Sequence, residues 1–316
     1  MKKITKALVI IFLGFITVLA LILIFFGHRD IPIQKLKAKY ATPPSLFMTL
    51  NGMEVHYRDE GNTQGEIPIV LIHGTGASLH TFDIWTEYLK KDYRVIRMDL
   101  PAYGLTGPFP NSNYSIEHYV EFIETFLSSL EIEHCIIAGN SLGGAIAWNV
   151  ALKHPNLVDK LVLINSSGYP SKAKSVPIAF KIAKLRPVNQ IFTFITPRFM
   201  AKASLNNVYV DRSKISKELV DRYFELSLRE GNRQAFIDRI GIKGDTTAYK
   251  NISSIQQRTL ILWGEQDELI PLINATRFHD DLKNDTLVII NGSGHVPMEE
   301  CPEQSVKALI SFLNSK

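Results

Sequence analysis

Six short apolar runs, separated by longer stretches with helical spacing, are the feature that most limits the folds open to this chain. Runs that are apolar throughout, rather than alternating, are typical of strands buried on both faces of a sheet. Strands that alternate with helices predict a mostly parallel sheet with helices on both faces. The six runs are 67–72, 93–98, 135–138, 161–165, 259–263 and 287–290.

The stretches around these runs supply the expected helices and one hairpin. Residues 115–130 place apolar side chains on one helical face, and Ser115 offers an N-cap. A second helix is expected over 145–153, directly after two glycines. Ahead of the first buried run, 46–57 alternates loosely around an Asn-Gly pair, which is a hairpin turn signal.

The segment 7–26 is uncharged and almost wholly apolar. At about 1.5 Å rise per residue it reaches about 30 Å, the thickness of a bilayer's hydrocarbon core. We expect an uncleaved transmembrane anchor, because the run is long and ends in a poor match to a signal-peptidase site. A cleaved signal peptide and a buried core helix are the alternatives.

The charges that flank this segment bear on its orientation. Lys2, Lys3 and Lys6 favour a cytoplasmic N-terminus, with the rest of the chain on the extracytoplasmic side, although Lys and Arg residues of 29–39 weaken the bias. The same three lysines account for three of the four net positive charges, so the rest of the chain sums to +1. That balance shows no electrostatic footprint of a nucleic-acid binder.

From 168 to 250 no buried-strand run appears, and 217–228 reads as an amphipathic helix. A helical insertion between two core strands predicts a cap over the edge of the sheet. The expected divisions are a basic N-terminus (1–6), a transmembrane anchor (7–26), a polar linker (27–45), a first core segment (46–167), the cap (168–250) and a second core segment (251–316).

The pentapeptide Gly-Asn-Ser-Leu-Gly at 139–143 is the sharpest chemical signal. It follows a predicted strand and precedes a predicted helix, which is the setting that a nucleophile elbow requires. Ser141 would stand at a helix N-terminus, where free N–H groups favour developing negative charge. We therefore predict that Ser141 is a nucleophile.

A serine hydroxyl needs a base to accept its proton, and the base needs an acid to orient it. His295 follows the last predicted strand in a glycine-rich turn, and we predict that it is the base. His73 also ends a strand, but we expect it to order its own loop. Asp267 follows the strand 259–263 and gives the order Ser, Asp, His; Glu265, Glu268 and Asp285 are rival acids.

The loop His-Gly-Thr-Gly at 73–76 follows the first buried strand. Its backbone could aim an N–H at the same point as the amide of Leu142, forming an oxyanion hole. We predict that Thr75 supplies the first donor, with Gly76 as the alternative.

Five motifs follow one another along the chain: I-H-G-T-G, M-D-L-P-A-Y-G-L-T-G, G-N-S-L-G-G, L-I-L-W-G-E-Q-D and G-S-G-H-V-P-M-E-E-C-P-E. With these motifs in this order, the chain resembles the α/β-hydrolase superfamily from Phe47 to Leu313. The resemblance implies a capped eight-stranded fold, water as co-substrate, and no metal or organic cofactor. Ser141 stands where haloalkane dehalogenases and epoxide hydrolases carry an aspartate. The G-N-S-x-G-G elbow is similar to that of carbon–carbon bond hydrolases, although Val296 replaces the aromatic residue that often follows their histidine.

These patterns together predict a serine hydrolase that cleaves carboxylic esters through an acyl-enzyme. Carbon–carbon bond hydrolysis of a dienoate and a catalytically idle binding protein are the alternatives. The expected partners are a small-molecule or lipid-like ester and, through the N-terminal helix, a membrane; the oligomeric state stays open. The apolar residues of the cap suggest a lipid-like or medium-chain substrate, or else simply form the core of the cap; they are Ile178, Phe180, Ile191, Phe192, Phe194, Ile195 and Phe199.

Overall fold

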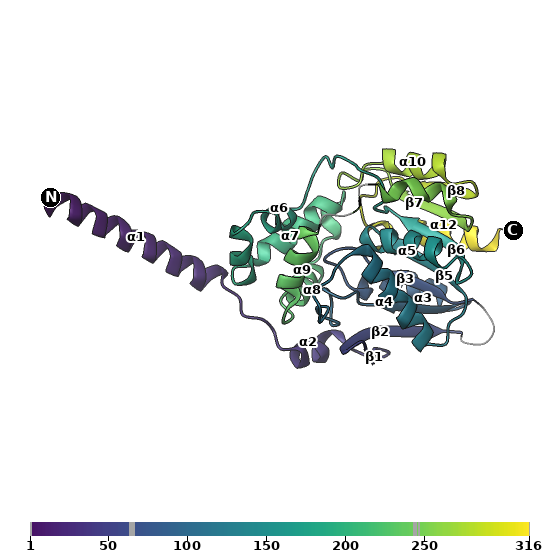
Figure 1. Ribbon diagram of the computed structural model, residues 1–316, viewed down its shortest axis with the longest axis horizontal. Helices are drawn as coiled ribbons and strands as arrows, with labels where there is room; N and C mark the ends of the chain where they lie inside the picture. Colours follow the sequence, from purple (N-terminus) through teal and green to yellow (C-terminus); the bar gives the residue numbers. More distant parts are fainter. Residues whose placement is uncertain (1, 63–66, 243–244, 246, 316) are drawn as a thin grey trace.

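An eight-stranded sheet forms the centre of the protein, with strand order β1-β2-β4-β3-β5-β6-β7-β8. The computed structural model (Figure 1) describes residues 2–62, 67–242, 245 and 247–315. β2 pairs antiparallel with β1 and β4, and every other pairing is parallel. The strands are β1 (Leu46–Leu50), β2 (Met53–Gly61), β3 (Ile69–Ile72), β4 (Arg94–Met98), β5 (Cys135–Asn140), β6 (Val158–Ile164), β7 (Arg258–Gly264) and β8 (Asp285–Ile290).

All six predicted strands and the predicted hairpin are present, so the mostly parallel α/β prediction is confirmed. β6 begins at Val158, earlier than predicted. Asp159 and Lys160 near its start are exposed and half-buried, so the continuous apolar run in the sequence begins only after them.

Helices cover both faces of the sheet because successive strand residues point to opposite sides. Val70 and Ile72 pack with α4 (Ile116–Ser129), α5 (Leu142–Lys153) and α10 (Ile273–Asp281). Ile69 and Leu71 pack on the other face with α3 (Asp83–Leu89) and α12 (Pro302–Asn314). Ser115 caps α4 as predicted, since its side chain accepts a hydrogen bond from the backbone N–H of His118.

The stretch between β6 and β7 is helical and lies beside one end of the sheet (Figure 1). Residues 243, 244 and 246 of this predicted cap lie outside the described residues, as do Met1 and Lys316 of the predicted terminal divisions. The elements are α6 (Ile178–Ala183), η2 (Val188–Thr193), α7 (Arg198–Val208), η3 (Arg212–Lys214), α8 (Lys217–Ser227), α9 (Asn232–Gly241) and η4 (Ala248–Ser254).

The N-terminal segment forms a single long helix, α1 (Lys2–Phe26), which projects away from the rest of the molecule (Figure 1). Its part from Leu8 to Phe26 is long and apolar enough to cross a membrane, and none of it is buried. Because no described side chain of this span is buried, it cannot be a core helix, and that alternative is wrong.

The predicted polar linker is more ordered than its composition indicates. It contains a helix, α2 (Ile33–Tyr40), whose Leu36 is buried against Leu105 and Leu226. Ile31 donates a backbone hydrogen bond of 2.7 Å to Leu228 in the cap. The segment after α1 is therefore packed on the folded domain and is not a free tether.

Candidate active site

Ser141 lies at a sharp turn between β5 and α5. Its backbone has φ 55° and ψ −112°, a strained conformation for a non-glycine residue. α5 begins at Leu142, three residues earlier than predicted, because glycines at 143 and 144 belong to its first turn. A Cβ on Gly143 would lie 2.2 Å from the carbonyl oxygen of Ile72, so only glycine allows this approach. The turn has the geometry of a nucleophile elbow.

Asp267 and His295 lie next to each other, although they follow different strands. Nδ1 of His295 is 2.7 Å from Oδ2 of Asp267, and both side chains are buried. Backbone N–H groups of Leu269 and Ile270 donate to the other carboxylate oxygen, at 2.8 and 2.9 Å. A carboxylate held in this way accepts the proton on Nδ1, which leaves Nε2 free to accept another.

The rival acids lie elsewhere. Glu265 and Glu268 are exposed. Asp285 binds His279 instead, with 2.8 Å between the carboxylate and Nδ1. Among the four acids considered from the sequence, Asp267 is thus the one that contacts His295.

Asn165, which the sequence analysis did not select, contacts the acid directly. It is fully buried and follows β6, and its Nδ2 donates to Oδ2 of Asp267 at 2.7 Å. Its Oδ1 accepts from the backbone N–H of Gly264 at 3.1 Å. The signal that could have found it is position, because a polar residue at the carboxyl end of β6 shares the sheet edge with Ser141 and Asp267.

A buried carboxylate, Glu300, joins the loop of His295 to the cap. It accepts backbone hydrogen bonds from Gly294 at 2.6 Å and from Val210 and Asp211 at 2.7 Å each. The N–H of His295 also donates to the carbonyl of Val208 at 2.8 Å. The end of α7 and the histidine loop therefore form one connected unit.

His73 orders its loop, as predicted. It is fully buried, its Nδ1 lies 2.8 Å from the carbonyl oxygen of Gly74, and its Nε2 accepts from the N–H of Leu100 at 2.9 Å. Burial lowers the pKa of His73, so the ring is held neutral. A Cβ on Gly74 would lie 3.1 Å from Cβ of Ser141, so this loop passes directly beside the serine.

Asp99 holds the segments of Leu79 and Leu105 together. Its carboxylate accepts from the N–H groups of Leu79 and Leu105 at 2.8 and 2.7 Å, and lies 2.7 Å from Nδ1 of His56. Burial alone would raise the pKa of Asp99, but the neighbouring His56 outweighs it and holds that pKa below its usual range. Asp99 therefore remains an anion that orders two loops.

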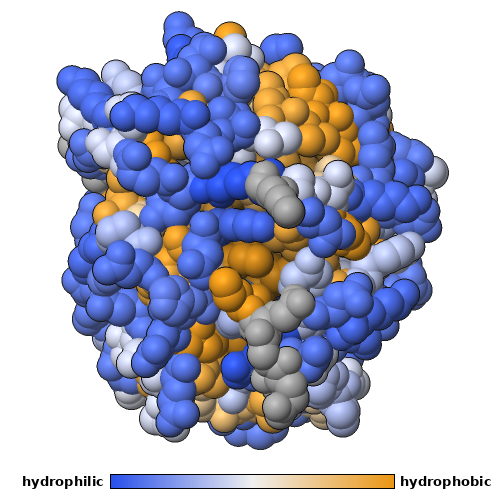
Figure 2. All heavy atoms as spheres, turned by 90° about the vertical axis from the view of Figure 1, so that its right-hand side faces the viewer, coloured by the Kyte–Doolittle hydropathy of each residue, from blue (hydrophilic) through white to orange (hydrophobic). Residues whose placement is uncertain are grey.

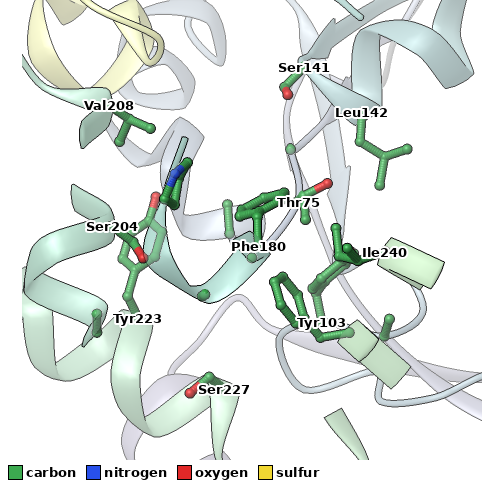
Figure 3. A pocket seen from close by; sticks show the side chains of 18 of the residues that line it. Thr75, Tyr103, Ser141, Leu142, Phe180, Ser204, Val208, Tyr223, Ser227 and Ile240 are labelled. Carbon is green, nitrogen blue, oxygen red and sulfur yellow. The ribbon is translucent and has the colours of Figure 1, made fainter. Parts of the chain in front are cut away.

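A cavity of about 370 Å³ lies between the sheet edge and the cap. Ser141, His295, Thr75 and Leu142 all line it, and Asp267 lies behind His295. Figure 3 shows Ser141 and Thr75 on the core side, facing Phe180, Ser204 and Tyr223 of the cap. The structure thus brings the five residues selected from the sequence to one place, while their catalytic roles remain predictions.

The apolar residues of the cap divide into two groups. Phe180 and Phe192 line the cavity, as an acyl-binding role would require. Most of the others are neither in the cavity nor in the core of the cap; Ile178, Ile191, Phe194 and Phe199 are exposed. The exposure of these four side chains was not predicted from the sequence.

Comparison with known proteins agrees with this geometry. The sequence profile of the alpha/beta hydrolase fold matches residues 67–302. An uncharacterised hydrolase of Bacillus subtilis is 27% identical over 277 residues, which cover 86% of this chain and 99% of the relative. The 2-hydroxy-6-oxo-6-(2'-aminophenyl)hexa-2,4-dienoic acid hydrolase of Metapseudomonas resinovorans is 28% identical over 282 residues, covering 85% and 91%.

A solved structure is similar over the same region. The meta-cleavage product hydrolase of Pseudomonas fluorescens matches with a TM-score of 0.73 and 25% identity, covering 85% of this chain and 97% of that one. The profile match spans most of the chain and includes the serine elbow and the histidine loop. The chain therefore belongs to the α/β-hydrolase family.

Proposed function

We propose that this protein is a serine hydrolase that cleaves carboxylic esters through an acyl-enzyme. The observation that carries the proposal is the 2.7 Å contact between His295 and Asp267, at the cavity into which the strained turn presents Ser141. A buried imidazole oriented by a carboxylate is the group that activates a serine hydroxyl.

In the proposed reaction, Nε2 of His295 takes the proton from Oγ of Ser141 as that oxygen attacks the ester carbonyl. The tetrahedral oxyanion accepts hydrogen bonds from the backbone amides of Thr75 and Leu142. Leu142 is the first residue of α5, so its N–H has no partner within the helix. His295 returns the proton to the leaving alcohol, and water then repeats the sequence and releases the acid.

The lining of the cavity supports a substrate with an apolar acyl group. The side chains opposite Ser141 are mostly aromatic or aliphatic, which suits burial of a hydrocarbon chain; they include Phe180, Phe192, Met200, Leu205, Phe236 and Ile240. The cavity volume of about 370 Å³ lies within the range of small-molecule binding sites.

Carbon–carbon bond hydrolysis of a dienoate is the second candidate, and one feature of the cavity favours it. Arg239 lines the cavity, its Nε is buried without a hydrogen-bond partner, and no acid among the described residues forms an ion pair with it. A guanidinium in this state suits a substrate carboxylate. Relatives named as hydrolases of such dienoates support the same candidate.

One comparison separates the candidates. Purified full-length protein is assayed with p-nitrophenyl esters of graded chain length and with a 2-hydroxy-6-oxo-dienoate. Ester cleavage that exceeds dienoate cleavage in kcat/KM supports the proposal, and the reverse order supports the second candidate. Arg239→Gln should lower kcat/KM for the dienoate alone, whereas the exposed Arg186→Gln serves as the matched control.

Covalent labelling tests the role of Ser141 itself. A fluorophosphonate probe should label the wild-type protein and fail to label Ser141→Ala. Absence of labelling in the folded wild-type protein would instead support a catalytically idle binding protein.

We also propose that α1 anchors the protein in a membrane, with the folded domain on the extracytoplasmic side. The supports are the apolar length of α1 and the lysines that precede it. Protease added outside intact cells should digest the domain of the full-length protein. Digestion only after the cells are opened would place the domain in the cytoplasm.

A further inference from the structure

Five large apolar side chains within the first part of the cap are exposed to solvent. We call them the cap apolar surface: Ile178, Leu185, Ile191, Phe194 and Phe199, which are 43%, 56%, 54%, 67% and 58% exposed. Single exposed apolar residues are ordinary, whereas exposed apolar residues that form one patch mark a protein or membrane interaction site. These five residues lie on α6, η2, α7 and the segments between them. On the face turned away from α1, hydrophilic side chains divide the apolar atoms into separate areas (Figure 2).

This surface meets the end of α1. The ring of Phe26 lies edge-to-face against that of Phe199, with centroids 6.2 Å apart. The N–H of His28 donates to the carbonyl of Phe194 at 3.0 Å, and Gly27 forms an antiparallel bridge with Ile195. Figure 1 shows α1 approaching the molecule beside α6 and α7.

The contact fixes the depth of the cap relative to a bilayer. Phe26 is the last residue of the apolar span, so a membrane-spanning α1 would place it at the edge of the hydrocarbon core. Phe199, which touches Phe26, then lies at the same depth. Phe is among the residues that interfacial helices bury at the boundary between headgroups and acyl chains.

The charges around the surface suit an anionic leaflet. Residues 160–210 contain no Asp or Glu. The basic residues after Lys160 in this range are Lys172, Lys174, Lys181, Lys184, Arg186 and Lys202, together with Arg198, which pairs with Asp221 at 2.6 Å. Lys and Arg side chains near an anionic membrane surface are attracted to it.

We propose that the cap apolar surface is seated in an anionic lipid leaflet, the one in which α1 ends. This inference rests on the proposed anchoring by α1 and is independent of which bond the enzyme cleaves. The inner side of the same segment lines the cavity through Phe180 and Phe192. The wall of the cavity would therefore rest directly on the lipid in which an acyl ester dissolves.

Fluorescence quenching in lipid nanodiscs tests the depth. Full-length Phe194→Trp is placed in discs of anionic lipid whose acyl chains carry bromine; the native Trp85, Trp148 and Trp263 are buried and give the background. The added tryptophan should lose fluorescence, because an interfacial apolar side chain lies about 5–10 Å into the boundary between headgroups and acyl chains. Ile289→Trp, at a residue 40% exposed on β8, is the matched control and should lose none.

A tryptophan placed in α1 distinguishes insertion of α1 from docking of the cap apolar surface. Phe15→Trp should be quenched if α1 is inserted. Quenching of this marker with none at Phe194→Trp would overturn the docking while leaving the anchor intact. An emission blue shift at Phe194→Trp without bromine quenching would indicate a second copy or another protein on the surface, and would also overturn the proposal.

The charge requirement has its own test. Replacing the anionic lipid by a zwitterionic one should reduce quenching at Phe194→Trp. Adding Lys181→Glu and Lys184→Glu in anionic discs should reduce it likewise, because both residues are exposed basic side chains of this segment. Equal quenching under all three conditions would overturn the anionic part of the proposal.

Discussion

Nδ2 of Asn165 donates a 2.7 Å hydrogen bond to Oδ2 of Asp267, the same oxygen that contacts His295. The residue has φ 43°, a left-handed conformation in which asparagine is among the best tolerated residues. Two donors on one carboxylate oxygen limit its rotation. Asn165 is therefore a positioning residue for the proposed acid.

Asn165→Ala should lower kcat by about tenfold or more while leaving KM nearly unchanged, because a hydrogen bond to a charged group contributes about 1.5–3 kcal/mol. Steady-state kinetics with an ester substrate measures kcat and KM separately. Asn149→Ala is the matched control, since it removes a 2.8 Å bond from Asn149 to Ala145 within α5. An unchanged kcat in folded Asn165→Ala would contradict the positioning role.

Asp267→Asn should lower ester turnover by about 10⁴-fold, because an amide favours the wrong tautomer of His295. The melting temperature should change little, since the replacement has the same shape. Glu265→Gln changes the same functional group at an exposed position and should keep full activity. Retained activity in Asp267→Asn would transfer the orienting role to another acid.

Gly74→Ala should reduce kcat/KM, because its Cβ would lie 2.8 Å from Oδ1 of Asn140 and 3.1 Å from Cβ of Ser141. Gly52→Ala should affect stability rather than rate. A Cβ at Gly52 would meet no atom within 4 Å, but the residue has φ 79° in the hairpin turn, a conformation that alanine disfavours. The substitution should cost stability, about 1 kcal/mol, with no change in rate. Chemical denaturation and ester kinetics on both variants test the distinction.

Asp30→Asn should lower the free energy of unfolding by about 1–2 kcal/mol, because Arg233 is buried and would lose its charged partner at 2.7 Å. The side chain of Asp30 is 41% exposed, so water screens part of the interaction. Glu54→Gln, which breaks the more exposed Lys37–Glu54 pair, should change stability by less than about 0.5 kcal/mol. Equal effects would argue against tight packing of the segment after α1.

Acid should destabilise the protein before its carboxylates titrate. Burial lowers the pKa of His80 to about 4 and also lowers that of His73. Asp99 opposes this shift, whereas Arg222 and Arg58 add to it at His80. The unfolded chain then binds more protons than the folded one between about pH 6.5 and 4. Stability is therefore full above pH 6.5 and falls below it, by up to about 1.4 kcal/mol per pH unit for each histidine.

His80→Gln should flatten this slope, because it removes one of the two titrating groups while keeping hydrogen-bonding capacity. Urea unfolding at pH 7, 6 and 5 provides the measurement. His134→Gln is the control, as that side chain is 58% exposed. A slope unchanged by His80→Gln would assign the acid sensitivity to other groups.

The strands could be predicted because burial on both faces leaves continuous apolar runs; β3 is such a run from end to end, and β5 and β7 each contain one of at least four residues. The serine turn could be predicted because close backbone approach requires glycines at fixed positions around Ser141. Strand order along the chain then brought Asp267 and His295 to the same sheet edge.

The packing of α2 and the contacts of Asn165 could not be predicted in the same way. Leu36 is one buried apolar residue in a basic segment, so it leaves no period to detect. Asn165 acts through directional hydrogen bonds to Asp267 and Gly264, and nothing in composition marks such bonds. The exposure of Phe194 also escaped prediction, since an apolar residue in a sequence reads as buried.

The attachment of Val208, Val210 and Asp211 to the histidine loop has a consequence for access to the cavity. A rigid-body movement of α7 would shift His295 relative to Ser141. The reason is that Glu300 joins the backbone after α7 to the backbone of the histidine loop. α6 and η2 also line the cavity, through Ala179, Phe180 and Phe192, and form none of these hydrogen bonds. Substitutions in α6 and η2 can therefore alter the size of the accepted acyl group while the proposed proton relay keeps its alignment.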